Sequence, residues 1–149
     1  MIFKRRRKKN NNLKYNNLSV KILPLICYEI IYSGKIFTNS KFDYIVNISE
    51  DGWFGKSIGP EQHFTHSIFR AIESGKYVLR SANNGITAII NPLGVIEQKV
   101  SINNSGYIDL SESRKIEMTL FAKFGNKIFG LIILLYIFLI FSFKKLRNE

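Results

Sequence analysis

The sequence predicts a mixed α/β (α+β) globular body followed by a single C-terminal transmembrane helix. Short runs of β-branched and aromatic residues alternate with helical patterns between residues 20 and 112, which is typical of a mixed fold. The last long segment, Ile128 to Phe143, contains no charged residue. An apolar content of 46% in 149 residues is enough for one domain with a buried core.

Residues 1–19 form a basic lead segment that we expect to be loop-like. Six consecutive basic residues, Lys4 to Lys9, are followed by three asparagines. Such a run suits binding to nucleic acid or anionic lipid, or a solvated loop. No basic helix face or aromatic stacking pattern continues it, which favours the solvated loop and predicts no nucleic-acid partner. No apolar segment follows the charges as in a signal peptide.

The globular body is expected to span residues 20–112 and to begin with a strand over residues 20–26. Pro24 lies inside this strand and is tolerated only at a sheet edge or a bulge. A short helix is expected from Glu29 to about Phe37. Residues 43–49 then form a buried strand by their β-branched content.

A glycine-rich loop over residues 50–59 should precede the main helix of the body. Gly59-Pro60 suits a helix start, because proline is favoured at the first helical position. Apolar residues then recur at helical spacing, and Gly75 stands where a C-terminal cap belongs. Four further strands are expected at residues 77–82, 86–91, 95–101 and 107–110.

Some polar residues of this region are assigned to structure. Arg70 and Glu73 are expected to make polar contacts between the helix and the core. Asn83, Asn84 and Gly85 are expected to form a tight turn between two strands, because an Asn-Gly pair favours positive φ.

The C-terminal part divides into a polar linker over residues 113–127, an apolar helix over residues 128–143 and a basic tail over residues 144–149. Sixteen helical residues cover about 24 Å, and flanking lysines can extend that span toward bilayer thickness. The segment has no polar stripe, which argues against a buried globular helix. The basic tail predicts a cytoplasmic C-terminus and a body outside the inner membrane.

Cys27, the single cysteine, follows the apolar run at residues 20–26, where the chain should turn from strand to helix. A thiol on such an elbow points into a cleft, as a nucleophile requires. A lone cysteine after an apolar strand is more often a small buried residue, so both interpretations stay open on these residues alone. The backbone N–H of Tyr28 could donate to an oxyanion, and Glu29 could reach the same cleft.

The two histidines, His63 and His66, could share a helix face as metal ligands. No carboxylate pattern completes such a site, which favours surface or capping histidines. Gly52, Gly55 and Gly59 are spaced for loop flexibility and do not form a phosphate-binding fingerprint. The sequence therefore predicts neither a metal nor a cofactor.

Four segments together resemble one family. They are ICYEI at 26–30, NISEDGWFGKSIGPEQH at 47–63, FRAIESGKYVLRSANNGITAIINPLG at 69–94 and TLFAKFGN at 119–126. In this order they are similar to the C-terminal part of the bacterial apolipoprotein N-acyltransferases, members of the nitrilase or carbon–nitrogen hydrolase superfamily. The match runs from about Ile22 to the C-terminal span, over four fifths of the chain.

The resemblance implies part of a four-layer αββα sandwich in the periplasm and a Glu-Lys-Cys triad whose nucleophile matches Cys27. That cysteine would take an acyl chain from a phospholipid as a thioester and pass it to the N-terminal amine of a lipid-modified apolipoprotein. Tyr28 and Glu29 match family residues beside the active site and are auxiliary candidates. Trp53 and Phe54 lie in a loop suited to lining an acyl pocket or touching the membrane, or they pack in the core.

The family's triad glutamate and lysine both precede the cysteine, whereas the 26 residues before Cys27 include no aspartate or glutamate. We therefore expect a C-terminal portion that is inactive alone, with an upstream-encoded polypeptide as a candidate to complete the site. Two alternatives remain: a membrane-tethered nitrilase-type amidase fragment, and a non-catalytic remnant or membrane-anchored binding protein.

Overall fold

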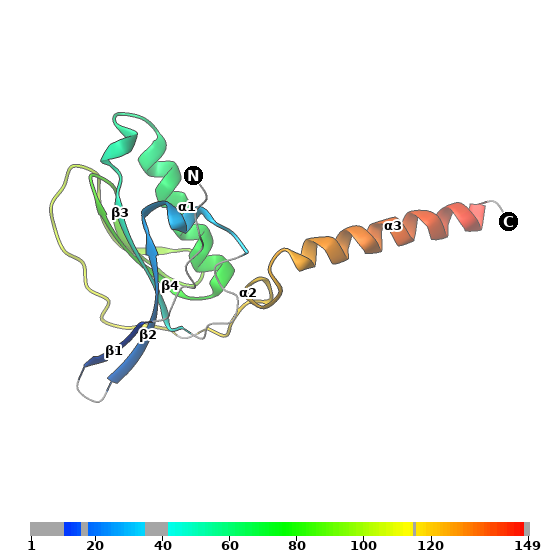
Figure 1. The fold of residues 1–149 in the computed structure, drawn as a ribbon, viewed down its shortest axis with the longest axis horizontal. Coiled ribbons are helices and arrows are strands. Elements are labelled where there is room, and N and C mark those ends of the chain that lie inside the picture. The colour runs from blue at the N-terminus through cyan, green and yellow to red at the C-terminus, as the bar shows by residue number, and fades with distance from the viewer. Residues whose placement is uncertain (1–10, 16–17, 35–41, 115, 148–149) are drawn as a thin grey trace, which may run out of the picture.

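The computed structural model describes residues 11–15, 18–34, 42–114 and 116–147. A six-stranded sheet in the order β1-β2-β3-β4-β5-β6 carries α1 on one face, and α3 projects from the body (Figure 1). The strands are β1 (Asn11–Tyr15), β2 (Leu18–Ile26), β3 (Tyr44–Glu50), β4 (Tyr77–Asn83), β5 (Thr87–Ile90) and β6 (Ile96–Val100). The helices are η1 (Cys27–Ile31), η2 (Gly52–Phe54), α1 (Gly59–Ser74), α2 (Leu120–Phe124) and α3 (Lys127–Arg147).

Strands β2, β3 and β4 are parallel, whereas β1, β5 and β6 pair antiparallel to their neighbours. The register places Ile26 of β2 opposite Ile48 of β3, and Ile48 opposite Ser81 of β4. The carboxyl ends of the three central strands therefore lie at one edge of the sheet. Cys27 follows β2 at that edge, which is where open α/β sheets place their functional groups.

The hydrophobic core lies between the sheet and α1. Apolar side chains from alternate positions of the strands meet Phe64 and Ala71 of the helix there. The core strand residues are Leu23, Leu25, Ile45, Val78, Ala88 and Ile90. On the opposite face, Ile26 and Ile48 are 57% and 55% exposed, so this part of the sheet is apolar and uncovered.

Pro24 lies within β2 and pairs with Val46 of β3. Among the described residues, the ladder between β1 and β2 runs from Leu18 to Ile22 of β2. The expectation that this proline lies at a sheet edge or a bulge stays a prediction, because residues 1–10 lie outside the described ranges.

The structure differs from the sequence prediction on both sides of the body. The helix expected from Glu29 to about Phe37 is a short 3-10 helix, η1, that begins at Cys27, and residues 35–41 lie outside the described ranges. The strand expected at residues 107–110 is wrong, because that segment has no regular secondary structure and pairs with no strand of the described sheet. Residues 1–19, expected as a loop-like lead, contain β1 and the start of β2.

The remaining differences lie near the C-terminus. The expected polar linker at residues 113–127 contains α2, which Thr119 caps by accepting a hydrogen bond from the backbone N–H of Ala122. Helix α3 extends beyond residues 128–143 at both ends. By length and composition it can cross a membrane, and none of its most apolar window, residues 127–144, is buried against the body.

Candidate functional site

Cys27 occupies a sharp elbow between β2 and η1. Its φ is 47°, a left-handed conformation that side chains other than glycine rarely adopt. Such strain persists only where the surrounding structure holds it, and it concentrates at functional sites. The thiol is free and half-buried, so the elbow leaves it partly accessible instead of burying it in the core.

Two side chains hold the backbone before and at the elbow. The Glu29 carboxylate accepts a hydrogen bond from the N–H of Ile26 at 2.8 Å. On the β3 side, the Asn47 amide donates to the carbonyl of Leu25 at 2.9 Å and to that of Cys27 at 3.4 Å. The position of the thiol is therefore fixed from both η1 and β3.

A third side chain holds the far end of η1. Arg70 of α1 donates to the Ile31 carbonyl at 3.1 Å and pairs with Glu73 at 2.8 Å. Burial raises the pKa of Glu73, and hydrogen bonds from Ser33 and Arg70 oppose that rise. The expectation that Arg70 and Glu73 make helix–core polar contacts is confirmed, and these contacts stabilise the segment that carries the cysteine.

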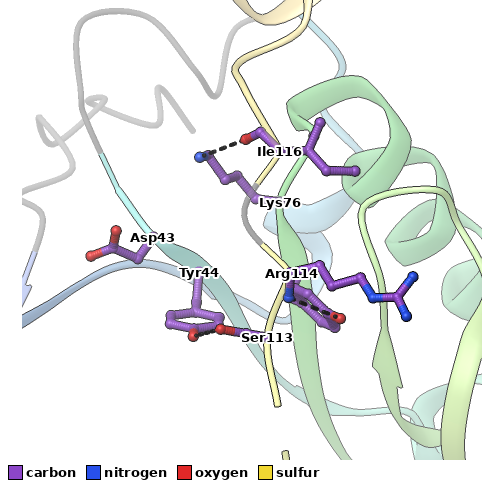
Figure 2. Close-up of a pocket in the computed structure, with 8 residues that line it drawn as sticks. Asp43, Tyr44, Lys76, Ser113, Arg114 and Ile116 are labelled. Atoms are coloured by element: carbon purple, nitrogen blue, oxygen red, sulfur yellow. Dashed lines mark hydrogen bonds between the residues drawn. The ribbon is translucent and has the colours of Figure 1, made fainter.

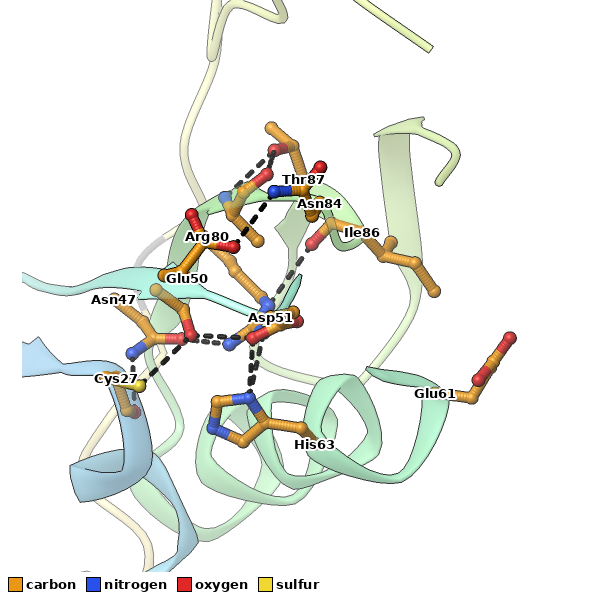
Figure 3. Close-up of polar contacts among 12 residues, drawn as sticks. Cys27, Asn47, Glu50, Asp51, Glu61, His63, Arg80, Asn84, Ile86 and Thr87 are labelled. Carbon is orange, nitrogen blue, oxygen red and sulfur yellow. Dashed lines mark hydrogen bonds and ion pairs between the residues drawn. The ribbon is translucent and has the colours of Figure 1, made fainter. Parts of the chain in front are cut away.

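Behind the cysteine lies a buried polar network centred on Asp51 (Figure 3). The Asp51 Oδ1 atom accepts from the Ser49 hydroxyl at 2.7 Å and lies 2.8 Å from His63 Nδ1. Its Oδ2 atom accepts from Arg80 at 2.6 Å, and Arg80 also donates to Asn47 Oδ1. The network thus runs from α1 and β4 through β3 to the elbow.

The charge state of Asp51 follows from these contacts. Burial alone would raise the pKa of its carboxyl group, because water no longer stabilises the anion. Hydrogen bonds from His63 and Ser49 and the charge of Arg80 outweigh burial and lower that pKa to about 2. At neutral pH Asp51 is an anion with three hydrogen-bond donors around it, which makes it a poor acceptor for the thiol proton of Cys27.

The β4–β5 turn closes over this network. A side chain on Gly85 would collide with the Asp51 carboxylate, so only glycine lets the turn approach so closely. Asn84, with φ of 53°, donates to Glu50 at 3.0 Å, and hydrogen bonds from Asn84, Gly52 and Asn83 lower the pKa of Glu50. The prediction of a turn between two strands here is confirmed, and positive φ occurs at Asn84 but not at Gly85.

The structure separates the two aromatic candidates of the η2 loop. Trp53 is 86% exposed, so its interpretation as a core residue is wrong. Phe54 is half-buried and packs against the His63 ring at 5.5 Å between centroids. Tyr28 is 55% exposed, and its ring lies 5.9 Å from the same histidine. The role of the Tyr28 N–H as an oxyanion donor stays a prediction.

His63 was expected at the surface or in a cap, and this expectation is wrong. It is 3% exposed and belongs to the Asp51 network, whereas its Nε2 atom has no hydrogen-bond partner in the described part of the chain. His66 stacks near Phe69 instead. Within the described ranges, no group of three or more His, Cys, Asp or Glu side chains is arranged to hold a metal ion.

A separate pocket lies at the opposite edge of the sheet, near the amino-terminal ends of β3 and β4 (Figure 2). Its lining includes Tyr44 and Tyr77, whose hydroxyl groups contact Ser113 and Arg114. The cavity measures about 20 Å³, which is room for about one water molecule. It is too small for a lipid or peptide and lies away from Cys27.

The sequence proposed Cys27, Tyr28 and Glu29 as site residues, and these roles stay predictions; it missed the network behind them. Asn47, Ser49 and Asp51 recur at every second position, and this period of two places Asn47 and Ser49 on the face of β3 that also carries Ile45. Polar residues at the inward positions of a buried strand could therefore have indicated a buried polar network. Arg80 and His63 join the network through the pairing of β4 and the packing of α1, which no local pattern encodes.

The chain matches the carbon–nitrogen hydrolase family model over residues 7–117 and belongs to that family. It is 48% identical over 138 residues to the apolipoprotein N-acyltransferase of Rickettsia bellii (strain RML369-C), covering 91% of this chain and 26% of the relative. The apolipoprotein N-acyltransferase of Wigglesworthia glossinidia brevipalpis is 45% identical over 107 residues, which cover 70% of this chain and 21% of that relative. The chain thus spans about a quarter of the length of these relatives.

Among solved structures, a mutant of the amidase from Nesterenkonia sp. AN1, with acrylamide added at its active-site cysteine, is similar at a TM-score of 0.47 and 12% identity. The similarity covers 64% of this chain and 40% of that amidase chain.

Proposed function

We propose that this chain forms the nucleophile-bearing part of an apolipoprotein N-acyltransferase, with Cys27 as the acyl carrier. The observation that carries the proposal is the strained elbow at Cys27, held by Asn47 and Arg70 at the carboxyl edge of the parallel strands. The 48% identity to an acyltransferase of this kind supports the substrate class.

The first step is attack of the Cys27 sulfur on the acyl ester of a phospholipid. A base takes the thiol proton, the C–S bond of a thioester forms, and the ester C–O bond breaks. The same proton then goes to the leaving oxygen, which releases a lysophospholipid. The thioester stores the acyl group and divides the transfer into two easier reactions.

The second step transfers the acyl group to the N-terminal amine of a lipid-modified apolipoprotein. The amine nitrogen forms the amide bond, the C–S bond breaks, and the amine proton returns to the thiolate through the base. During both steps the carbonyl oxygen gains negative charge. We assign the backbone N–H of Tyr28 as one donor to that oxyanion, because it follows the nucleophile on the elbow.

The base comes from outside these 149 residues in this proposal. Asp51 is excluded by its pKa of about 2 and its three donors. We propose that a glutamate and a lysine are contributed by a preceding segment or a separately encoded polypeptide. The uncovered apolar face near Ile26 and Ile48 offers a surface on which such a segment would pack.

Trp53, Phe54 and α3 are proposed to bring the site to its lipid substrates. Exposed aromatic rings favour the membrane–water interface, and Trp53 is almost wholly exposed beside half-buried Phe54. We propose that α3 spans the inner membrane, with the body in the periplasm. The basic residues at its end, Lys144 to Arg147, support a cytoplasmic C-terminus.

The proposal is tested with a chimera in which this chain replaces its matching region in the Rickettsia bellii relative. We expect the chimera to acylate an apolipoprotein, seen as a mass increase of its N-terminal peptide. Cys27→Ala should abolish the product, whereas Ser101→Ala, an exposed position after β6, should not. Release of ammonia from simple amides without acylation of apolipoprotein would contradict the proposal and favour an amidase.

A further inference from the structure

We propose that Ser49 is a positioning residue for Cys27: its hydroxyl donates to Asp51 while the cysteine is a thiol and to the sulfur once the cysteine is a thiolate. The inference rests on the proposed role of Cys27 as the nucleophile. It assigns a function to the contact between the elbow and the buried network in Figure 3.

The geometry gives Ser49 two acceptors for one hydrogen. Its Oγ atom lies 2.7 Å from Asp51 Oδ1 and 3.6 Å from Cys27 Sγ. A hydroxyl has a single proton, and the shorter bond to a charged carboxylate is the stronger one. In the resting state the lone pairs of Ser49 therefore face the sulfur, and the thiol of Cys27 donates to them.

Loss of the thiol proton reverses this preference. A thiolate cannot donate, and a lone pair of Ser49 directed at it would be repulsive. Rotation of the Ser49 hydroxyl turns that repulsion into a charge-assisted hydrogen bond. Asp51 tolerates the rotation because His63 Nδ1 at 2.8 Å and Arg80 at 2.6 Å still contact its two oxygens.

Charged or titratable side chains lie on each element that packs near the thiol. Glu29 lies on η1, Asp51 follows β3, His63 lies on α1 and Arg80 lies on β4. Burial lowers the pKa of Arg80, whereas Asp51 and then Cys27 oppose that shift. Arg80 thus supplies a positive charge near the sulfur, and Ser49 is the neutral group that can change its donor direction.

Formation of the Cys27 thiolate is a proton transfer and needs no redox partner. The S–H bond of Cys27 breaks, and its proton goes to the base proposed above or, in a test without that base, to water or buffer. The O–H group of Ser49 exchanges its acceptor from Asp51 to the sulfur. No other covalent bond changes.

The test measures alkylation of Cys27 by iodoacetamide across a range of pH, with the full 149-residue chain in detergent micelles. Cys27 is the only cysteine, so the adduct mass reports this site alone. We expect Ser49→Ala to slow alkylation about fivefold near pH 7, as loss of one hydrogen bond would. In Ser49→Ala the alkylation rate should begin to rise at a higher pH than in wild type. The plateau of the alkylation rate at high pH should be the same in both.

Two variants separate a donor role from simple packing. Ser49→Thr keeps the hydroxyl group and should restore the wild-type profile, and Ser81→Ala on the other face of the sheet should match wild type. A Ser49→Ala profile that overlays wild type, changes by one factor at every pH or becomes faster would overturn the inference. Because alkylation needs neither phospholipid nor apolipoprotein, failure of the chimera would not be confused with failure here.

Discussion

Asp51 shows how one side chain can serve both stability and the site. It is fully buried and carries a charge, which is costly unless that charge is paired. Arg80 and His63 pair it from two elements, and Ser49 connects it to Cys27. The same carboxylate thus helps hold α1 to β4 and orients the neighbour of the thiol.

Asp51→Asn should destabilise the body by about 3–5 kcal/mol, because it leaves Arg80 buried without its partner charge. Thermal unfolding of the chain in detergent measures this loss. Asp109→Asn, a change at an exposed position, is the matched control and should stay within about 0.5 kcal/mol of wild type. Equal stability of the two variants would contradict the pairing.

The same carboxyl group predicts a dependence of stability on pH. Its pKa falls from 3.8 to about 2 on folding, so the folded state binds the proton more weakly than the unfolded state. The stabilisation is therefore complete above about pH 4 and is lost as pH falls toward 2. Unfolding scans between pH 5 and 2 should show this loss in wild type, and Asp51→Asn should remove that part of the decline.

At the scale of single residues, the sequence singled out Cys27 as the candidate nucleophile but not the side chains that hold it. Cys27 was found because it ends an apolar run within a five-residue pattern. Ser49 and His63 were not predicted as members of the buried network, because each contacts partners that lie elsewhere in the fold. Trp53 was left between two interpretations, since sequence alone does not show that its ring is exposed.

At the scale of elements, α1 is the support on which the elbow rests. Its C-terminal half carries Arg70, which binds η1, and its last carbonyls are capped by Gly75 with φ of 66°. The backbone carbonyl of Glu117 would lie 2.9 Å from any Cβ at Gly75. The helix end therefore requires glycine for both its conformation and its packing against the chain before α2.

Gly75→Ala should lower the free energy of unfolding by about 1–2 kcal/mol, because alanine is strained in the left-handed region. Gly130→Ala in α3 is the control, since a Cβ at that position would meet nothing within 4 Å apart from its chain neighbours and the backbone of its own helix. Chemical or thermal unfolding of both variants measures the difference. A loss at Gly130→Ala as large as at Gly75→Ala would contradict this account of the cap.

The elements with strong local signals were predicted well. Proline near the start and glycine at the end defined α1, and β-branched runs defined β2 and β3. The elements that were missed lack such signals: β1 is rich in asparagine and lysine, and α2 has only five residues. Residues 107–110 look like a strand locally, but they pair with no strand in the part of the chain that the structure describes.

At the scale of the whole molecule, α1 covers one face of the sheet and α3 extends away from the body (Figure 1). On the other face of the sheet, Ile26 and Ile48 are exposed. If α3 spans a membrane as proposed, Cys27 would meet the proposed lipid donor and lipid-modified acceptor by lateral diffusion. The orientation of the chain then decides which compartment the thiol faces.

We predict that a membrane-impermeant maleimide labels Cys27 in intact spheroplasts, because the body is proposed to lie outside the inner membrane. The Cys27→Ala variant gives the background, since the chain has no second cysteine. Labelling that appears only after lysis would place the body in the cytoplasm and contradict the orientation inferred from Lys144 and Arg147.

Cys27 is proposed to carry an acyl group, and the mass of the Cys27 peptide shows directly whether it does. The chimera is incubated with phospholipid vesicles and no acceptor, then quenched in acid and digested. We predict a peptide heavier by one fatty acyl group, which hydroxylamine removes and Cys27→Ala lacks. The 149-residue chain alone should give no such peptide. An unmodified Cys27 in an otherwise folded chimera, or a thioester formed by the chain alone, would contradict the account.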